Sequence, residues 1–453
     1  MIIFFKKIKK ENLVSFLILF SLLNLSFNPF NLFLGLGLLL IIVIISLIIN
    51  SNYIVLLPFY FYPFLFILKS REPNNLILSS LPEISVFISF FYIFLNQKIL
   101  KYEKHLFFLL FLIAFFLVLV SFLHILDIYF LPALIRQYAL PIIFLIIFIN
   151  ASLRKNELPM EAFKICVISY SIVSIVALLN YFKMIELLEY PHYRPSIFCI
   201  NDSAALLLSC INGEMPRALP LLGGSIGTSA NILWMLGIAV ILSCKSSGNY
   251  YLKYFSIPLF ILGLFSTSFS VIIPIAYSLA VITLSKYKKY YKQILISLII
   301  IFILFLTNFG FFGEETVFKY FKLTILSGIL DHFENIKIIN FLFGSGPVIS
   351  SEKFEFFPEK FIIDVGILRV LTETGFFNFF LFLLVLFYFL KKILWLEVNY
   401  PSNYNKSLLI MFLTLISAVH GNMAITSPFY PLFVMVVSSI VVQYRLKKNY
   451  LIK

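Results

Sequence analysis

The stretch FFKKIKKENLVSFLILFSLL, residues 4–23, decides the fold class of this chain. Its first half is basic, and its second half is an apolar run interrupted only by serines. A secretory signal peptide begins with the same order of segments, but no cleavage site of small residues follows here and many further apolar runs do. The stretch therefore predicts a retained first membrane helix.

Apolar runs continue along the whole chain of 453 residues, of which 61% are hydrophobic and only 12% are charged. Many of these runs reach the roughly 17–25 residues that cross a ~30 Å hydrocarbon layer. We expect about fourteen membrane helices, within a range of about 12–14, and place them near residues 13–28, 30–48, 52–68, 76–96, 106–124, 129–150, 162–182, 229–244, 254–269, 271–284, 293–309, 367–390, 406–422 and 429–444. The predicted fold is an all-α polytopic membrane protein, with residues 1–453 forming a single integral membrane domain.

The basic residues are concentrated in alternate loops. With the N-terminus in the cytoplasm, the inside segments hold 23 of the 35 Lys and Arg residues but only 5 of the 21 acids. These segments are 1–12, 97–105, 151–164, 245–253, 285–292, 391–406 and 445–453. Because Lys and Arg resist translocation, this bias predicts that both termini are cytoplasmic. The net charge of +14 then reflects topology, and no nucleic-acid partner is predicted.

Two long segments fall on the outside, residues 183–228 and 310–366, and long structured loops are where function concentrates. In the second loop, residues 315–341 have apolar positions at helical spacing, which predicts an amphipathic helix on the membrane surface. The chain has no GxxxxGK[ST], HExxH or CxxC motif, so nucleotide, zinc-protease and CxxC redox chemistries are not indicated.

Charged residues at membrane depth are functional candidates by default. Arg136 lies within the sixth predicted span between two prolines, and Glu83 in the fourth span is a candidate partner. The alternatives are a structural buried arginine or a phosphate ligand. Arg369 and Glu373 are four residues apart and so share a helix face. They either form a local ion pair, or Arg369 binds an anionic substrate while Asp364 or Glu373 lies near an attacking hydroxyl.

The outward histidines His192, His332 and His420 are weaker candidates for substrate binding, as is Arg194 in the first long loop. A hydrogen-bonded structural histidine is the alternative for each of the three. No second ligand stands at zinc spacing from any of them, so no metal and no cofactor is predicted.

Residues 217–236, RALPLLGGSIGTSANILWML, combine Arg217, a glycine-rich turn containing Gly224, and a helix opening that includes Asn231. A helix N-terminus attracts phosphate through its free N–H groups, and arginine grips phosphate oxygens in a bidentate manner. This stretch therefore predicts a pyrophosphate site at the outer membrane surface. The alternative is a capped helix whose arginine snorkels to lipid headgroups.

From these motifs the chain resembles the bacterial O-antigen polymerase (Wzy) family, within the superfamily of O-antigen polymerases and ligases. The matching positions in the first loop and the span that follows it are Arg217, Gly224 and Asn231. The matching positions in the second loop and the span that follows it are FGSG (343–346), Asp364 and ETG (373–375). The likeness covers about residues 160–445. It implies a GT-C-like helical membrane glycosyltransferase in the bacterial inner membrane.

The resemblance also implies the reaction. An undecaprenyl-pyrophosphate-linked oligosaccharide would be both donor and acceptor, with membrane lipid and a chain-length regulator protein as further partners. Arginines would neutralise the leaving pyrophosphate without a metal, and a carboxylate or histidine would take the hydroxyl proton. The chain lacks an arginine at 266–274, where family members often carry one, and has FIIDVG where ligases typically carry a histidine. The first difference is a departure from the family pattern, and the FIIDVG stretch favours a polymerase over an O-antigen ligase. A second alternative, a lipid-linked oligosaccharide flippase, is disfavoured because a flippase is expected to lack two long outside loops and to have two halves of similar pattern.

Overall fold

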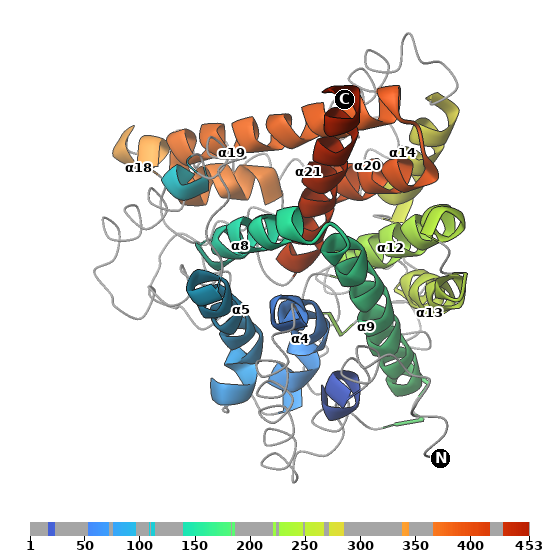
Figure 1. Cartoon of the computed structure of the whole chain (residues 1–453). Helices are drawn as coiled ribbons and strands as arrows, with labels where there is room; N and C mark the ends of the chain where they lie inside the picture. Colours follow the sequence, from blue (N-terminus) through green and yellow to red (C-terminus); the bar gives the residue numbers. More distant parts are fainter. Residues whose placement is uncertain are drawn as a thin grey trace, which may run out of the picture.

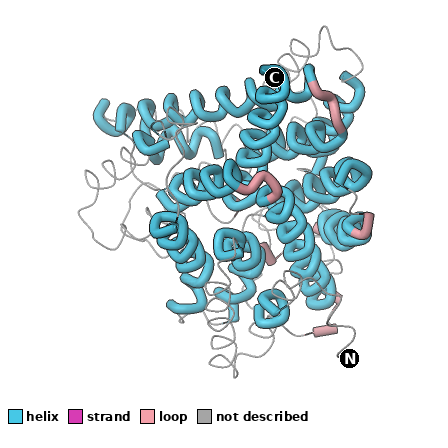
Figure 2. Tube along the Cα trace, in the orientation of Figure 1, coloured by secondary structure: helices cyan, strands magenta, loops and turns pink. Residues whose placement is uncertain are grey.

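The structure is a computed structural model, and it describes only part of the chain. The described residues are 17–22, 53–71, 76–96, 108, 110–113, 139–182, 184–185, 221–222, 226–247, 250–266, 271–284, 338–343, 366–416 and 429–452. Within them every regular element is a helix and no strand occurs (Figure 2). The predicted all-helical fold is therefore confirmed for this part of the chain.

The described helices follow the predicted apolar runs closely. They are α4 (Tyr53–Arg71), α5 (Leu76–Asn96), α8 (Leu140–Arg154), α9 (Leu158–Tyr181), α12 (Ile226–Ser247), α13 (Leu252–Phe265), α14 (Ile272–Leu284), α18 (Ile338–Phe343), α19 (Gly366–Asn399), α20 (Asn403–Ile416) and α21 (Tyr430–Ile452). The runs predicted at 30–48 and 293–309 lie outside the described residues, and those at 13–28 and 106–124 lie mostly outside them.

Two described segments are long and apolar enough to cross a membrane by length and composition, namely Leu158–Tyr181 and Thr374–Asn399. Six shorter apolar helices, of 10–17 residues, accompany them. The number of membrane spans and their orientation therefore stay predictions.

Proline and a tight turn set the boundary between α8 and α9. Helix α8 ends at Arg154, and the N–H of Lys155 donates to the carbonyl of Ala151. Helix α9 starts with Pro159 in its first turn, where proline is favoured because no intrahelical N–H is needed. The short turn directs α9 away from α8, and α9 then packs against α13 and α4 (Figure 1).

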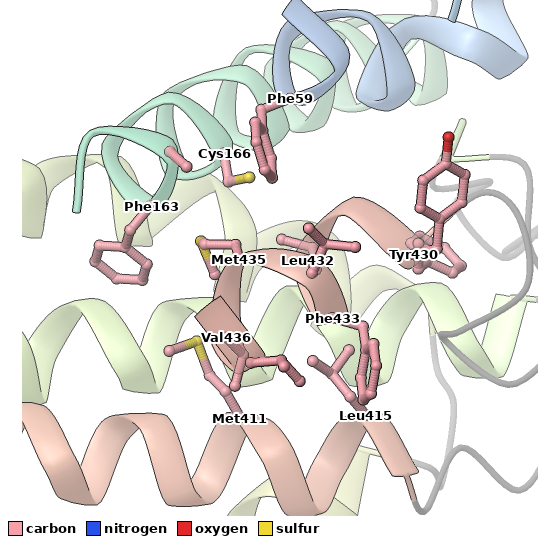
Figure 3. Packing of buried hydrophobic residues seen from close by; sticks show 14 of the residues in the cluster. Phe59, Phe163, Cys166, Met411, Leu415, Tyr430, Leu432, Phe433, Met435 and Val436 are labelled. Atoms are coloured by element: carbon pink, nitrogen blue, oxygen red, sulfur yellow. The ribbon is translucent and has the colours of Figure 1, made fainter. Parts of the chain in front are cut away.

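The core lies where α20 and α21 meet the N-terminal helices. Figure 3 shows Met411 and Leu415 of α20 facing Phe433 and Val436 of α21, with Phe163 and Cys166 of α9 above them. The Phe412 and Phe433 rings stack with centroids 6.3 Å apart. Cys166 and Cys244 are buried free thiols.

Helices α12 and α13 interlock through two glycines. A Cβ on Gly263 of α13 would lie 2.5 Å from Nε1 of Trp234 on α12, and a Cβ on Gly237 of α12 would lie 2.6 Å from Cζ of Phe260 on α13. The two rings meet edge to face, with centroids 5.0 Å apart. Each glycine therefore makes the space for the ring of the opposite helix, and this contact fixes the hairpin that begins at the opening of α12.

Candidate functional site

The structure describes only some of the predicted site residues. Asn231 is described with its side chain on α12, and Arg369 and Glu373 are described as backbone within α19. The other predicted residues lie outside the described part of the chain: Arg217, Asp364, Arg136, Arg194, Gly224, His192, His332 and His420. The predicted partner of Arg136, Glu83, is buried on α5.

The opening of α12 is polar and buried. The helix begins at Ile226, three residues before the predicted start at Ser229, so Thr228, Ser229 and Asn231 lie inside its first two turns rather than capping it. All three are at most 3% exposed. Asn231 lies three residues after Thr228, so these two share one helix face, whereas Ser229 lies on another.

Two atoms at this opening lack hydrogen-bond partners. Neither Oδ1 of Asn231 nor Oγ of Ser229 has a partner among the described contacts, and both atoms are buried. An unsatisfied buried polar atom typically costs about 1–3 kcal/mol. Trp234, one turn further along, also has a buried Nε1 without a partner, which follows from its close fit against Gly263. No such packing reason is evident for Asn231.

The backbone just before α12 is strained. Leu221 has φ 55°, the only positive φ at a non-glycine residue in the described part of the chain, and it is 1% exposed. A bulky residue is an outlier in this region, and such strain costs of order 1–3 kcal/mol and clusters at functional sites. The strained residue stands four positions after Arg217 and ten before Asn231. It marks the same stretch that the sequence singled out.

The second predicted motif contains a break in α19. Gly375 has φ 80° and ψ 170°, which divides the helix into arms 366–374 and 376–399. This conformation is essentially restricted to glycine. Arg369 and Glu373 therefore lie together on the short arm, and the long arm carries the membrane-span candidate. The predicted span of 367–390 did not include this break, and the long arm extends to Asn399, through residues predicted as an inside loop.

Asn378 partly repairs the hydrogen bonding at this break. Its Nδ2 donates to the carbonyl of Thr374, the residue just before the break, at 2.9 Å. Its Oδ1 is buried and accepts no hydrogen bond from the described residues, and the side chain is only 3% exposed. Sequence reasoning missed Asn378. The only signal was an asparagine one turn after the glycine of ETG, a pattern too common to identify a site.

Helix α18, in the middle of the second long loop, packs against the residues that follow this break. Phe341 stacks on Phe376 with centroids 5.7 Å apart and an interplanar angle of 19°. Phe343 lies beside Phe377, at 5.8 Å. Phe343 is also the first residue of the FGSG motif. The structure therefore brings the start of FGSG and the residues directly after ETG together, although about thirty positions separate them in the sequence.

The polar residues at the opening of α12 and those at the break in α19 are positioned by the same neighbouring helix, α20. Helix α12 and helix α19 both pack against α20, which lies between them in Figure 1. In that view the first turns of α12 lie near the centre of the molecule and the break in α19 lies toward the edge that carries α18. The described residues thus form two separate polar sites, one at Asn231 and one at Gly375 and Asn378.

The described residues offer few groups for acid–base or metal chemistry. No three His, Cys, Asp or Glu side chains lie together in this part of the chain. Glu397, near the end of α19, is 3% exposed, and its carboxylate oxygens accept no hydrogen bond from the described residues. It is another buried polar group that the sequence did not reveal, because it was assigned to an exposed inside loop.

Comparison of the chain with protein-family models, with curated proteins and with solved structures finds no match.

Proposed function

We propose that the chain is a polytopic membrane glycosyltransferase that polymerises lipid-linked oligosaccharides on the periplasmic face of a bacterial inner membrane, as an O-antigen polymerase does. The growing glycan would move from its undecaprenyl pyrophosphate carrier to a hydroxyl of a fresh lipid-linked repeat unit. Support comes from the apolar helices, the charge bias between alternate loops, and the two long segments on the predicted outer side.

In this reaction the bond between the anomeric carbon and the pyrophosphate oxygen breaks, and its electron pair stays on the pyrophosphate. A new bond forms between the anomeric carbon and the acceptor oxygen, whose proton passes to Asp364 or Glu373. Arg217 and Arg369 neutralise the charge that grows on the leaving group, which makes pyrophosphate a good leaving group without a metal. Arg136, Arg194, Gly224, Asn231 and the histidines His192, His332 and His420 contribute to binding the substrates.

The observation that carries this proposal is the buried amide of Asn231. Its Oδ1 is an acceptor held in an apolar helix at a cost in stability, directly after the segment that contains Arg217 and Gly224. A sugar hydroxyl is the kind of donor that this oxygen lacks, and a repeat unit offers many. The strained Leu221 between Arg217 and Asn231 fits the same interpretation.

The test is the length of glycan made by a deletion strain carrying variants of this chain. Arg217→Ala should abolish polymer while protein level and membrane insertion stay normal, because losing one such donor costs about 100–1000-fold in rate. Arg217→Lys should recover only part of the activity, since lysine keeps the charge but loses the bidentate fork. Arg154→Ala, at the exposed end of α8, is the matched control and should give normal chains.

The deletion strain itself separates the alternatives. Loss of a polymerase leaves a single repeat unit on the lipid, loss of a ligase leaves bare core, and loss of a flippase strands units on the inner face. Normal-length glycan from the Arg217→Ala strain would contradict the proposed site. A fully active Arg217→Lys variant with a mildly impaired Arg217→Ala variant would instead identify an arginine that snorkels to headgroups.

A further inference from the structure

Lysines and aromatic rings gather where the ends of α19 and α21 meet. Lys392 of α19 lies with Nζ 4.9 Å from the centroid of the Tyr444 ring on α21, and Lys448 lies 5.9 Å from the same ring. Lys447 lies 5.3 Å from the ring of Tyr400. Together with the tryptophan between these rings they form a group that we call the lysine–aromatic cluster: Lys392, Trp395, Tyr400, Tyr444, Lys447 and Lys448.

Trp395 joins the two halves of this cluster. Its ring lies 4.9 Å from that of Tyr444 and 5.6 Å from that of Tyr400, measured between centroids. The rings therefore form one continuous aromatic surface with Lys447 and Lys448 on it. A lysine stem lies along apolar surface while its ammonium stays accessible, and the structure leaves Lys448 exposed and Lys447 half-buried.

The positive charges of Lys447 and Lys448 are not neutralised by acids in the described part of the chain. Lys447 and Lys448 make no ion pair there beyond their ring contacts. A cation–π contact holds an ammonium in place but leaves its full charge and its N–H donors available. Glu397, two positions after Trp395 in the sequence, is buried, and its carboxylate oxygens accept no hydrogen bond from the described residues. The ammonium groups of Lys447 and Lys448 are therefore available to an external anion.

We propose that the lysine–aromatic cluster is a binding site for an anionic phospholipid of the cytoplasmic leaflet. Lys447 and Lys448 would hold the phosphate of the headgroup, and the amphipathic rings of Trp395, Tyr400 and Tyr444 would lie at the level between headgroups and acyl chains. Aromatic rings of this kind concentrate at both membrane interfaces, and basic pockets between helices bind anionic headgroups there.

A lipid fits the cluster better than a free phosphate ion does. A site for a small soluble anion needs no aromatic surface, whereas three adjoining rings with polar tips match the boundary between water and hydrocarbon. Arg445, beside Tyr444, donates to the carbonyl of Leu153 at 3.0 Å and ties the end of α8 to the same region. This proposal rests on the orientation proposed above and not on glycosyl transfer, so it is tested without any activity measurement.

Trp395 provides a direct probe, because the chain has only two tryptophans. In a Trp234→Phe background its fluorescence would be followed in the full-length protein in detergent micelles, as phosphatidylglycerol or phosphatidylcholine with brominated acyl chains is added. We expect brominated phosphatidylglycerol to quench Trp395 at a much lower mole fraction than brominated phosphatidylcholine. If Trp234→Phe does not fold, total quenching of the natural chain and the lipid-induced rise in its unfolding temperature give the same comparison.

The double variant Lys447→Gln with Lys448→Gln should raise the half-quenching concentration of phosphatidylglycerol about 25-fold, at roughly fivefold for each lysine. Lys164→Gln with Lys253→Gln is the matched control. It removes two lysines from segments predicted to lie on the same side of the membrane, and Lys253 also lies over a tyrosine ring, 5.0 Å from the centroid of Tyr254. The control should leave quenching unchanged.

Equal quenching by the two lipids would overturn the proposal, as would unchanged phosphatidylglycerol binding in the Lys447 and Lys448 double variant. Displacement of the lipid by submillimolar inorganic phosphate would show a soluble-anion site instead, and would also overturn it. A polymer-negative Arg217→Ala strain has no bearing on these outcomes, so failure of the lipid site and failure of the proposed reaction are distinguishable.

Discussion

Asn231→Leu should make the protein more stable and less active at the same time. The buried Oδ1 of Asn231 has no hydrogen-bond partner in the described structure, and an unsatisfied buried oxygen costs about 1–3 kcal/mol. Leucine has a similar branched shape, removes that oxygen and adds a few tenths of a kcal/mol of helix propensity. The gain in unfolding free energy should therefore be of order 1–3 kcal/mol.

Two measurements test this prediction on the same preparations. Fluorescence-detected thermal unfolding in detergent should show a higher midpoint for Asn231→Leu than for the natural chain. Immunoblots of a complemented deletion strain should show single repeat units or short chains, because the substrate loses its acceptor. A substitution that raises stability and lowers activity indicates that the natural residue serves function although it destabilises the fold.

Ser169→Ala is the matched control for this variant. Ser169 lies on α9, is 0% exposed, and its Oγ also lacks a partner, but it lies outside the proposed site. Its removal should raise stability in the same direction and leave chain length unchanged. The reasoning fails if Asn231→Leu unfolds at a lower temperature than the natural chain, or if its glycan has normal length.

Three further predictions concern packing, backbone and topology. Gly263→Ala should lower the free energy of unfolding by about 1–3 kcal/mol, because the added methyl group overpacks against Trp234, and this outweighs the ~1 kcal/mol that alanine gains in helix propensity. Adding Trp234→Leu to the same chain should restore much of the lost stability, which thermal unfolding would measure. Gly375→Ala should cost of order 1–3 kcal/mol, because alanine is strained at φ 80° and ψ 170°, and an unchanged midpoint would contradict this break. Reporter fusions at Asn249, Lys289 and Tyr400 should report cytoplasm and those at Glu214 and Glu355 periplasm; the proposed two-loop site fails if the last two lie on opposite sides.

Apolar runs and their boundaries could be predicted well from the sequence. The run predicted at 76–96 coincides with α5, and that predicted at 271–284 differs from α14 by one residue. The reason is that long apolar runs with few helix breakers determine helix type and position almost by themselves. The largest boundary error is at the end of α19, which was predicted near residue 390 and lies at Asn399. The prediction ended the helix too early because Lys391 and Lys392 are charged and were assigned to a loop.

The break in α19 could not be predicted from the sequence, and the reason is physical. Gly375 adopts a conformation that glycine allows but does not require, so the sequence gives no sign of which glycine bends a helix. The same holds for Leu221, whose positive φ runs against its own preference. Both conformations are imposed by tertiary packing, which periodicity and propensity do not contain.

The polar residues that mark a candidate site differ from the other polar residues in being buried. Burial depends on tertiary packing, so the sequence does not reveal it. Ser229, Asn231 and Trp234 each have a buried, unpartnered polar atom and lie within six positions, more such residues than on any other helix in the described part of the chain. Trp234 owes its state to the close fit against Gly263, and a serine hydroxyl is a small loss. Asn231 has an unsatisfied carbonyl oxygen, which can accept two hydrogen bonds, and no packing reason accounts for it. Under the function proposed above, a substrate hydroxyl that donates to Oδ1 would remove this penalty in the bound state only, and ligand binding would then raise the stability of the protein.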